Sequence, residues 1–236
     1  MKEASRQRAV VGLSGGVDSS LTLKIAIDAL GPSKVTAIIL PELGISSQEN
    51  IDHAKKLAEF LKVETFYQPL NTFLIDFSTI RWNPNELAQM NTKARIRMTI
   101  IYNYANTKNA IVLGTSNLSE SMIGYGTKYG DLAADVEVLG SLYKTEVYEL
   151  AEFAGLPPEI IHKAPSAELK IGQTDEEEIG GSYRDIDNIL MKMESGLTLD
   201  EIIDRGLDPN LVRKISRMRI ESEHKRKLPP VLAVDK

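Results

Sequence analysis

The stretch Gly12-Leu-Ser-Gly-Gly-Val-Asp-Ser19 decides the fold, because it joins a short apolar segment to an apolar, helix-like segment. Its adjacent glycines let the backbone turn tightly and aim successive N–H groups at an anion. A helix that starts near Asp18 adds the positive end of its dipole. The stretch therefore predicts a phosphate-binding turn after a buried strand, at the edge where open α/β sheets bind ligands.

The acidic residue Asp18 distinguishes this loop from the common phosphate-binding motifs. The loop has neither the Gly-Lys-Ser/Thr ending of a Walker A motif nor a Gly-x-Gly-x-x-Gly pattern. A carboxylate beside phosphates repels them unless a divalent cation lies between, so we interpret Asp18 as a magnesium ligand. The alternative is an ordinary helix start with Ser and Asp as caps, and the paired glycines and clustered serines argue against it.

Strand-like and helix-like segments alternate along the first two-thirds of the chain. Short apolar and β-branched runs predict strands at residues 9–13, 35–40, 63–67 and 110–114. Apolar residues at helical spacing and capping signals predict helices at residues 18–30, 46–61, 83–105 and 144–154. The alternation predicts an α/β fold over residues 1–236, with a doubly wound parallel sheet flanked by helices in a single domain.

Three segments lack a regular pattern: residues 119–135, residues 164–182 and the stretch after Arg213. The first two are rich in glycine and polar residues. Long irregular segments inside a compact domain are usually lids or binding loops, so we expect mobile loops near 119–135 and 164–182.

Composition excludes several classes of protein. The net charge is -5 at pH 7, which argues against a broad nucleic-acid surface. The chain has no cysteine, so disulfides, thiolate zinc sites and cysteine nucleophiles are excluded. No stretch approaches the ~18 apolar residues of a membrane span, and the N-terminus lacks an export signal. We expect a cytoplasmic enzyme without nucleic-acid or membrane partners.

The loop resembles the SGGxDS signature of the PP-loop ATP pyrophosphatases, which cleave ATP between the α- and β-phosphates and activate a substrate oxygen as its adenylate. GMP, argininosuccinate and asparagine synthetases and tRNA-modifying enzymes all carry versions of this loop. The resemblance implies an adenine-nucleotide alpha hydrolase-like, Rossmann-like fold, but the loop alone does not identify the member.

Later blocks of sequence resemble NAD synthetases in their order and spacing. The family makes NAD from nicotinic acid adenine dinucleotide (deamido-NAD), ATP and nitrogen. Two departures are visible: Ser166 stands where many members have Thr, and Gly126 stands where an aromatic residue is expected. The seven blocks are Asn91–Met98, Gly114–Glu120, Thr127–Asp131, Leu142–Val147, Pro165–Leu169, Gly172–Glu176 and Glu223–Arg226.

The resemblance implies roles for individual residues. Asp18 and Glu120 are the implied Mg²⁺ ligands and act in catalysis together with Lys144, while Asp131 is a candidate for binding ammonium or accepting its proton. The implied ATP site comprises Gly12, Leu13, Ser14, Gly15, Gly16, Val17, Asp18, Ser19, Thr115, Lys144 and Ser166. The implied deamido-NAD site comprises Arg97, Lys128, Asp135, His224 and Lys225.

Each role has a simpler alternative. Arg97 on a long helix is compatible with a surface ion pair, Lys144 with a plain helix start, and His224 with a solvated face. Glu120 is a plausible metal ligand on chemistry alone, because it follows the carboxyl end of a strand. Two other functions also stay open: another PP-loop amidating enzyme such as a GMP synthetase, and a non-catalytic nucleotide-binding module.

The resemblance also bears on nitrogen and assembly. Without cysteine there is no nucleophile for a glutaminase domain, so we expect free ammonia or a separate partner to supply nitrogen. Family members are usually homodimers with the dinucleotide at the subunit interface, which implies a homodimer here. The helix at residues 88–105 carries apolar residues on more than one face, although a buried monomer helix has the same pattern.

Overall fold

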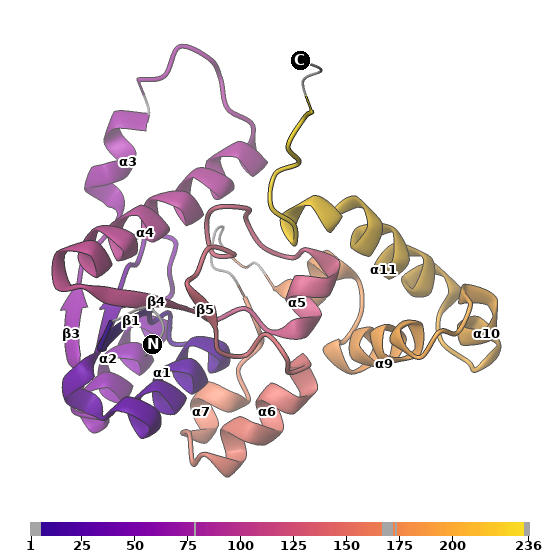
Figure 1. Cartoon of the computed structure of the whole chain (residues 1–236), viewed down its shortest axis with the longest axis horizontal. Helices are drawn as coiled ribbons and strands as arrows, with labels where there is room; N and C mark the ends of the chain where they lie inside the picture. The colour runs from indigo at the N-terminus through magenta and orange to yellow at the C-terminus, as the bar shows by residue number, and fades with distance from the viewer. Residues whose placement is uncertain (1–5, 78, 167–171, 173, 234–236) are drawn as a thin grey trace.

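The computed structural model describes residues 6–77, 79–166, 172 and 174–233 of the chain. Within these residues the strands form one parallel sheet in the order β3-β2-β1-β4-β5, which confirms the predicted fold class (Figure 1). The fifth strand was not predicted, because two residues are too few to give a pattern. The strands are β1 (Arg8–Gly12), β2 (Val35–Ile39), β3 (Glu64–Tyr67), β4 (Ala110–Gly114) and β5 (Val136–Glu137).

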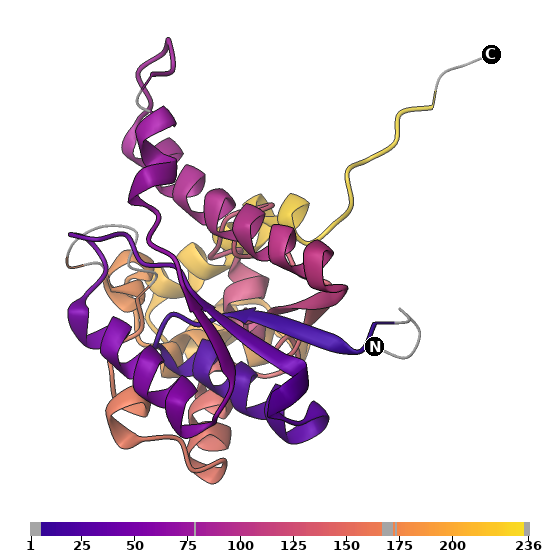
Figure 2. The same ribbon diagram turned by 90° about the vertical axis from the view of Figure 1, so that its left-hand side faces the viewer.

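Helices cover both faces of the sheet, because alternate strand residues point to opposite faces. Val10 and Val112 pack on one face against the long helix α4 (Glu86–Lys108). Val11 and Leu113 pack on the other face against α1 (Val17–Leu30) and its neighbours. Figure 2 shows the two layers of helix with the sheet between them. The neighbours of α1 on that face are α2 (Gln48–Phe60), α6 (Lys144–Phe153) and α7 (Pro158–Ile161).

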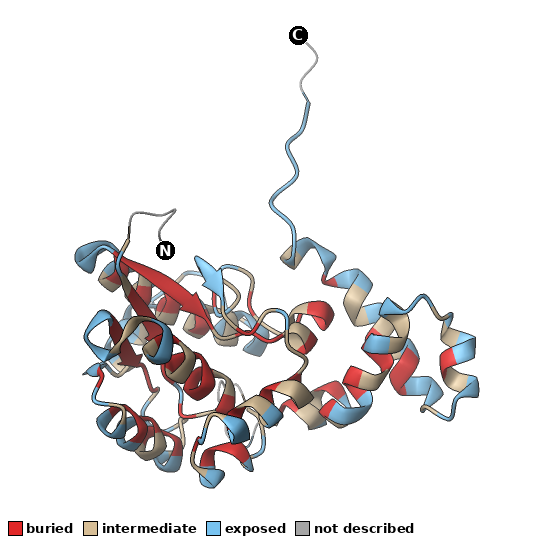
Figure 3. Cartoon of the chain, turned by 60° about the horizontal axis from the view of Figure 1, so that its bottom comes forward, coloured by how far each residue is buried: buried red, intermediate tan, exposed pale blue. Residues whose placement is uncertain are grey.

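The C-terminal helices form a separate group beside the sheet. They share an apolar cluster that includes Tyr183, Ile186 and Ile215, each of them buried. In Figure 3 the buried residues of this group face one another, whereas its outer surface is exposed. The group consists of α5 (Leu118–Ile123), α8 (Asp175–Ile179), α9 (Tyr183–Glu194), α10 (Leu199–Asp204) and α11 (Pro209–Glu221). The remaining helical elements are η1 (Pro32–Lys34), α3 (Asn71–Phe77) and η2 (Glu223–Lys225).

Two helices start later than the sequence predicts. Ser47, not Ser46, caps α2 by accepting a hydrogen bond from the Asn50 N–H. Asn85, not Asn83, caps α4 by accepting from the Ala88 N–H at 2.9 Å. In both places the sequence offers a second capping residue within two positions of the first, so the pattern alone does not choose between them.

The segments predicted to be irregular contain helices. Helix α5 occupies the start of the first segment and α8 lies in the second. Helix α11 continues past Arg213 to Glu221, with Leu211 and Ile215 buried beneath a basic outer face. These helices are short or strongly charged, which hides their apolar spacing. Residues 167–171 and 173 of the second segment lie outside the described residues.

Candidate active site

The strand order reverses between β1 and β4, and the loops after these two strands border a crevice at the carboxyl edge of the sheet. A cavity of about 620 Å³ opens there. Its walls come from the first loop, from α4, from the turn after β4 and from the start of α6. A mostly apolar cavity with a few convergent charged groups is the usual form of a small-molecule site.

The loop after β1 is held by its own hydroxyl groups. The Ser14 and Ser19 hydroxyl oxygens are 2.9 Å apart, and Ser19 Oγ also donates to the Gly16 carbonyl at 3.1 Å. Gly15 has a φ of +90°, and a Cβ there would lie 2.2 Å from the Asn50 carbonyl oxygen. Only glycine fits at position 15. Gly15 therefore shapes the loop and is absent from the cavity wall, while the other residues of Gly12–Ser19 line it.

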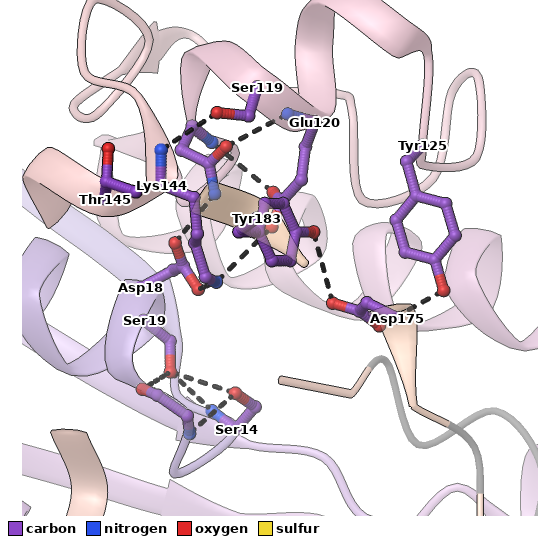
Figure 4. Close-up of polar contacts among 12 residues, drawn as sticks. Ser14, Asp18, Ser19, Ser119, Glu120, Tyr125, Lys144, Thr145, Asp175 and Tyr183 are labelled. Atoms are coloured by element: carbon purple, nitrogen blue, oxygen red, sulfur yellow. Dashed lines mark hydrogen bonds and ion pairs between the residues drawn. The ribbon is translucent and has the colours of Figure 1, made fainter. Parts of the chain in front are cut away.

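Three charged groups meet at the floor of the cavity (Figure 4). Asp18, in the first turn of α1, accepts hydrogen bonds from Lys144 Nζ and, at 2.9 Å, from the side-chain amide of Asn117. Lys144 Nζ also lies 3.6 Å from Glu120 Oε1. Asn117 caps α5, and a reciprocal hydrogen bond joins its N–H to the Glu120 carboxylate. Residues more than a hundred positions apart thus form one cluster.

Burial and mutual repulsion set the ionisation of this cluster. Burial, and then the negative charge of Asp18, raise the pKa of Glu120 to about 8, although Lys144 opposes the shift. Burial would lower the pKa of Lys144, which is 1% exposed, but the carboxylates of Asp18 and Glu120 raise it above its usual value. Lys144 is therefore a permanent cation, and the Glu120 carboxyl takes up or releases a proton near neutral pH.

A second polar cluster on the cavity wall was missed at the level of sequence. The Tyr125 hydroxyl lies 2.7 Å from Glu178 Oε2 and 3.1 Å from Asp175 Oδ1. The Tyr183 hydroxyl donates to Asp175 Oδ2 at 3.4 Å (Figure 4). Burial raises the pKa of Asp175. Asp175 stands in a run of four acidic residues, and nothing in that run distinguishes the buried one.

Several residues of the implied substrate sites also line the cavity. Thr115 directly follows β4, and Ser166 lies beyond α7. Arg97 projects from α4 and donates from Nε to the Leu40 carbonyl at 3.0 Å. It is half-buried at the cavity. The structure therefore places Arg97 at the cavity, and not at a fully exposed position on α4.

Two more of the implied residues meet at the segment after α5: Asp131 belongs to it, and Lys225 reaches it from η2. Lys225 Nζ donates to the carbonyls of Gly124 and Gly126, at 2.7 Å in each case. The Asp131 carboxylate accepts from the Thr127 N–H at 3.1 Å, and burial raises the pKa of Asp131. A Cβ at Gly126 would lie 2.7 Å from Asp131 Oδ2. A larger side chain at position 126 would therefore require the Asp131 and Leu132 side chains to move.

Three implied residues of the deamido-NAD site do not line this cavity. Lys128 Nζ donates to the His224 carbonyl at 2.6 Å. Asp135 Oδ2 accepts from the Val112 N–H at 2.8 Å, which holds the chain beside β4. His224 borders a smaller, adjoining pocket together with Lys225. Within one copy of the chain, these three side chains are separate from the cavity that Arg97 lines.

The described residues contain no group of three or more His, Asp or Glu side chains arranged to hold a metal ion. Asp18 and Glu120 are two carboxylates, a number that suits Mg²⁺ when substrate phosphates supply further oxygens.

Among the described helices, none has the length and apolar character needed to cross a membrane.

Relatives of known identity resemble the chain over almost all of its length. The family model described as NAD synthase matches residues 1–229. The NH(3)-dependent NAD(+) synthetase of Methanocaldococcus jannaschii is 43% identical over 98% of this chain and 90% of its own length. The enzyme of the same name from Archaeoglobus fulgidus is 42% identical over 95% of this chain and 88% of its own length.

Solved structures give the same result. The NH3-dependent NAD synthetase from Campylobacter jejuni superposes with a TM-score of 0.83 and 34% identity, covering 98% of this chain and 92% of that one. The NMN synthetase from Francisella tularensis has a TM-score of 0.85 and 33% identity, and the match covers 99% of this chain and 92% of that one. These matches decide against a GMP synthetase-like enzyme. They show that the chain belongs to the NAD synthase family.

Proposed function

We propose that the chain is an ammonia-dependent ligase that converts deamido-NAD to NAD, with cleavage of ATP to AMP and pyrophosphate. The observation that carries the proposal is the cluster of Asp18, Lys144 and Glu120 beside the loop after β1, in a chain of the NAD synthase family. The curated relatives named as NH(3)-dependent NAD(+) synthetases support it over nearly the full chain.

The reaction needs ATP because a carboxylate is a poor acyl donor. Attack of the nicotinate carboxylate on the α-phosphorus of ATP forms an acyl-adenylate and releases pyrophosphate. Ammonia then attacks the acyl carbon, and AMP leaves as the amide forms. The first step depends mainly on positioning and on neutralising the charge of the phosphates.

The loop Gly12–Ser19 and the charged cluster are suited to the first step. The start of α1 presents backbone N–H groups and the positive end of a helix dipole to the phosphates. Lys144 is held at the cavity floor as a cation and is placed to meet the negative charge that develops on pyrophosphate. Thr115 and Ser166 add hydroxyl groups on the cavity wall.

Asp18 and Glu120 fit a magnesium ion by their donor chemistry. Both are oxygen donors, and the charge of Asp18 raises the pKa of Glu120, as expected of carboxylates that share one site. When bound, the metal would neutralise phosphate charge beside Lys144. Asp18 and Glu120 would hold it, and Asn117 keeps both carboxylates in place.

The dinucleotide is proposed to occupy the rest of the cavity, where Arg97, Lys225 and Asp131 lie. Asp131 remains our candidate for binding ammonium or accepting its proton. An Asp131→Asn variant that formed amide at the normal rate would remove that role. The separate positions of Lys128, Asp135 and His224 suggest that any contact with the dinucleotide requires a second copy of the chain.

A homodimer is therefore part of the proposal. Large apolar side chains are exposed between α3 and the start of α4, among them Ile75 at 64%, Trp82 at 70% and Leu87 at 64%. Leu87 also lines the cavity, so this surface adjoins the proposed dinucleotide site. A second copy on this surface would cover the apolar side chains and close the cavity.

We also propose that residues 1–236 act as one catalytic domain, in the cytoplasm.

A second candidate substrate is the mononucleotide. The NMN synthetase from Francisella tularensis is 33% identical to this chain, so amidation of nicotinic acid mononucleotide is the alternative. The curated NAD(+) synthetases at 43% and 42% identity favour the dinucleotide.

One assay separates these activities. Purified chain is given Mg-ATP and ammonium chloride with either the dinucleotide or the mononucleotide, and the amide products are separated by chromatography. We expect a higher kcat/KM for the dinucleotide, and saturable turnover with ammonium alone. A higher kcat/KM for the mononucleotide would replace the substrate assignment, and turnover that needs glutamine plus another protein would overturn ammonia dependence.

A further inference from the structure

We propose that Asp187, a buried residue of α9 that lies outside the cavity wall, is a positioning residue for both Lys144 and Glu120. Asp187 is 1% exposed and belongs to the C-terminal group of helices. Its carboxylate accepts hydrogen bonds from Ser119 of α5 and Thr145 of α6, the two helices that carry Glu120 and Lys144. The inference rests on the proposed function, because it assigns a task to residues that support the same reaction.

The first contact runs through Ser119. The Ser119 hydroxyl donates to Asp187 Oδ1 at 2.5 Å. The same hydroxyl accepts from the Lys144 N–H at 2.9 Å (Figure 4). Ser119 is fully buried, and it precedes Glu120 in the first turn of α5. One hydroxyl therefore connects Asp187 to the backbone of Lys144, and Ser119 is covalently joined to Glu120.

The second contact is direct. Asp187 Oδ2 accepts from the Thr145 N–H at 2.9 Å. Lys144 and Thr145 are the first two residues of α6, and Tyr143 before them makes no side-chain cap bond. A helix leaves its first N–H groups without partners inside the helix, so Ser119 and Asp187 replace the missing cap. The negative carboxylate also interacts favourably with the positive end of the α6 dipole.

The arrangement fixes the position of Lys144 by its backbone. Its side chain reaches the Asp18 and Glu120 carboxylates, so a displacement of the α6 start moves the ammonium group relative to both. Glu120 is tied to the same point through its neighbour Ser119. Asp187 thereby sets the distance between the cation and the carboxylate on which the proposed ATP chemistry depends.

The test uses Asp187→Asn and Ser119→Ala, with Asp185→Asn as the matched control. An amide at position 187 keeps the shape but cannot accept from both Ser119 Oγ and the Thr145 N–H. Asp185 lies on the same helix and is exposed, and its replacement leaves these contacts intact. Thermal unfolding and circular dichroism establish which variants are folded, and nucleotide-binding stoichiometry gives the active fraction.

We expect kcat for NAD formation to fall roughly 10- to 100-fold in Asp187→Asn and in Ser119→Ala. This is the usual cost of losing a residue that holds a metal-binding side chain in place. The KM for deamido-NAD should stay within about 2-fold, and the Mg²⁺ concentration for half-maximal rate should rise. A purely structural loss lowers the active fraction without moving the Mg²⁺ dependence. The loss of kcat in the double variant should be smaller than the product of the two single losses, because Asp187 and Ser119 share one of their contacts.

Three results would overturn the proposal. The first is a normal kcat and a normal Mg²⁺ dependence in the folded variants. The others are a loss of kcat in the double variant equal to the product of the single losses, and a loss of kcat in Asp185→Asn as large as in Asp187→Asn. If Asp187→Asn does not fold, Ser119→Ala carries the test. If the wild-type chain forms no amide, the proposed function fails. In that case the affinity for Mg-ATP by calorimetry, compared between wild type and Ser119→Ala, still decides the role of Asp187.

Discussion

At the scale of single residues, Lys144 is the centre of the account. It is 1% exposed and contacts two carboxylates, Asp18 and Glu120, that come from helices on either side of the crevice. A cation in this position holds the carboxylates together, and we propose that it also neutralises phosphate charge of ATP.

Lys144→Met tests this role. The substitution keeps most of the side-chain volume and removes the charge, so we expect kcat to fall by about 10²- to 10³-fold, the usual cost of losing one group that stabilises developing charge. The control is Lys24→Met on α1, whose ammonium group pairs with Asp28 and lies away from the cavity. Steady-state kinetics on both variants make the comparison, and equal effects would contradict a special role for Lys144.

Glu120 gives a prediction about pH. Burial and the charge of Asp18 raise its pKa to about 8, above the value of about 4.5 for an unfolded chain. The folded state therefore binds the proton more tightly, so its stability is greatest at low pH and declines as pH rises from about 4.5 to about 8. Glu120→Gln removes this decline.

Chemical denaturation in metal-free buffer measures the difference. The stability of Glu120→Gln relative to wild type should increase between pH 5 and pH 8.5, and Mg²⁺ should reduce that increase by stabilising the ionised wild-type carboxyl. A constant difference across this pH range would mean that Glu120 ionises normally.

At the scale of elements, short helix α5 does most to assemble the site. Its cap, Asn117, also donates to Asp18 at 2.9 Å, so one side chain both starts the helix and orients a carboxylate of α1. Asn85 caps α4 by a similar bond to the Ala88 N–H, and it lies outside the cavity wall.

The two caps form a matched pair. Asn85→Ala should cost about 1 kcal/mol of folding stability, the usual value of a lost N-cap, and Asn117→Ala should cost more, because it also removes the buried hydrogen bond to Asp18. Only Asn117→Ala should also lower kcat, because only Asn117 orients Asp18. Urea denaturation and kinetics on the two variants test this. A similar loss of activity in both would assign the effect to stability alone.

The helices and strands also show how much of the structure can be predicted from the sequence. Long strands and helices with a clear apolar spacing, such as β4 and α1, lie within a residue or so of their predicted bounds. Three residues to which the resemblance assigns roles, Thr115, Lys144 and Glu120, line one cavity, and their roles stay predictions. Neither approach identified Asn117 or Asp187, because a cap and a buried carboxylate acquire their roles only when distant segments meet. The roles implied for Lys128 and Asp135 stay predictions, because neither residue lines the cavity within one copy of the chain.

At the scale of the whole molecule, the exposed apolar surface between α3 and α4 is where we propose that a second copy of the chain packs. We expect Trp82→Glu to shift the mass in light scattering from dimer to monomer and to raise the KM for deamido-NAD, because a charge at the interface opposes association. Phe153→Glu is the control, since Phe153 is 88% exposed at the end of α6. A wild-type monomer with full activity would contradict the proposed dimer.

The central claim is that the loop Gly12–Ser19 supports activation of a carboxylate as its adenylate. The most direct measurement uses deamido-NAD with ¹⁸O in its nicotinate carboxylate, together with Mg-ATP and ammonium, and mass spectrometry of the products. The account predicts one AMP and one pyrophosphate for each NAD, with one ¹⁸O atom transferred to AMP. Formation of ADP, or ¹⁸O recovered in inorganic phosphate, would contradict it.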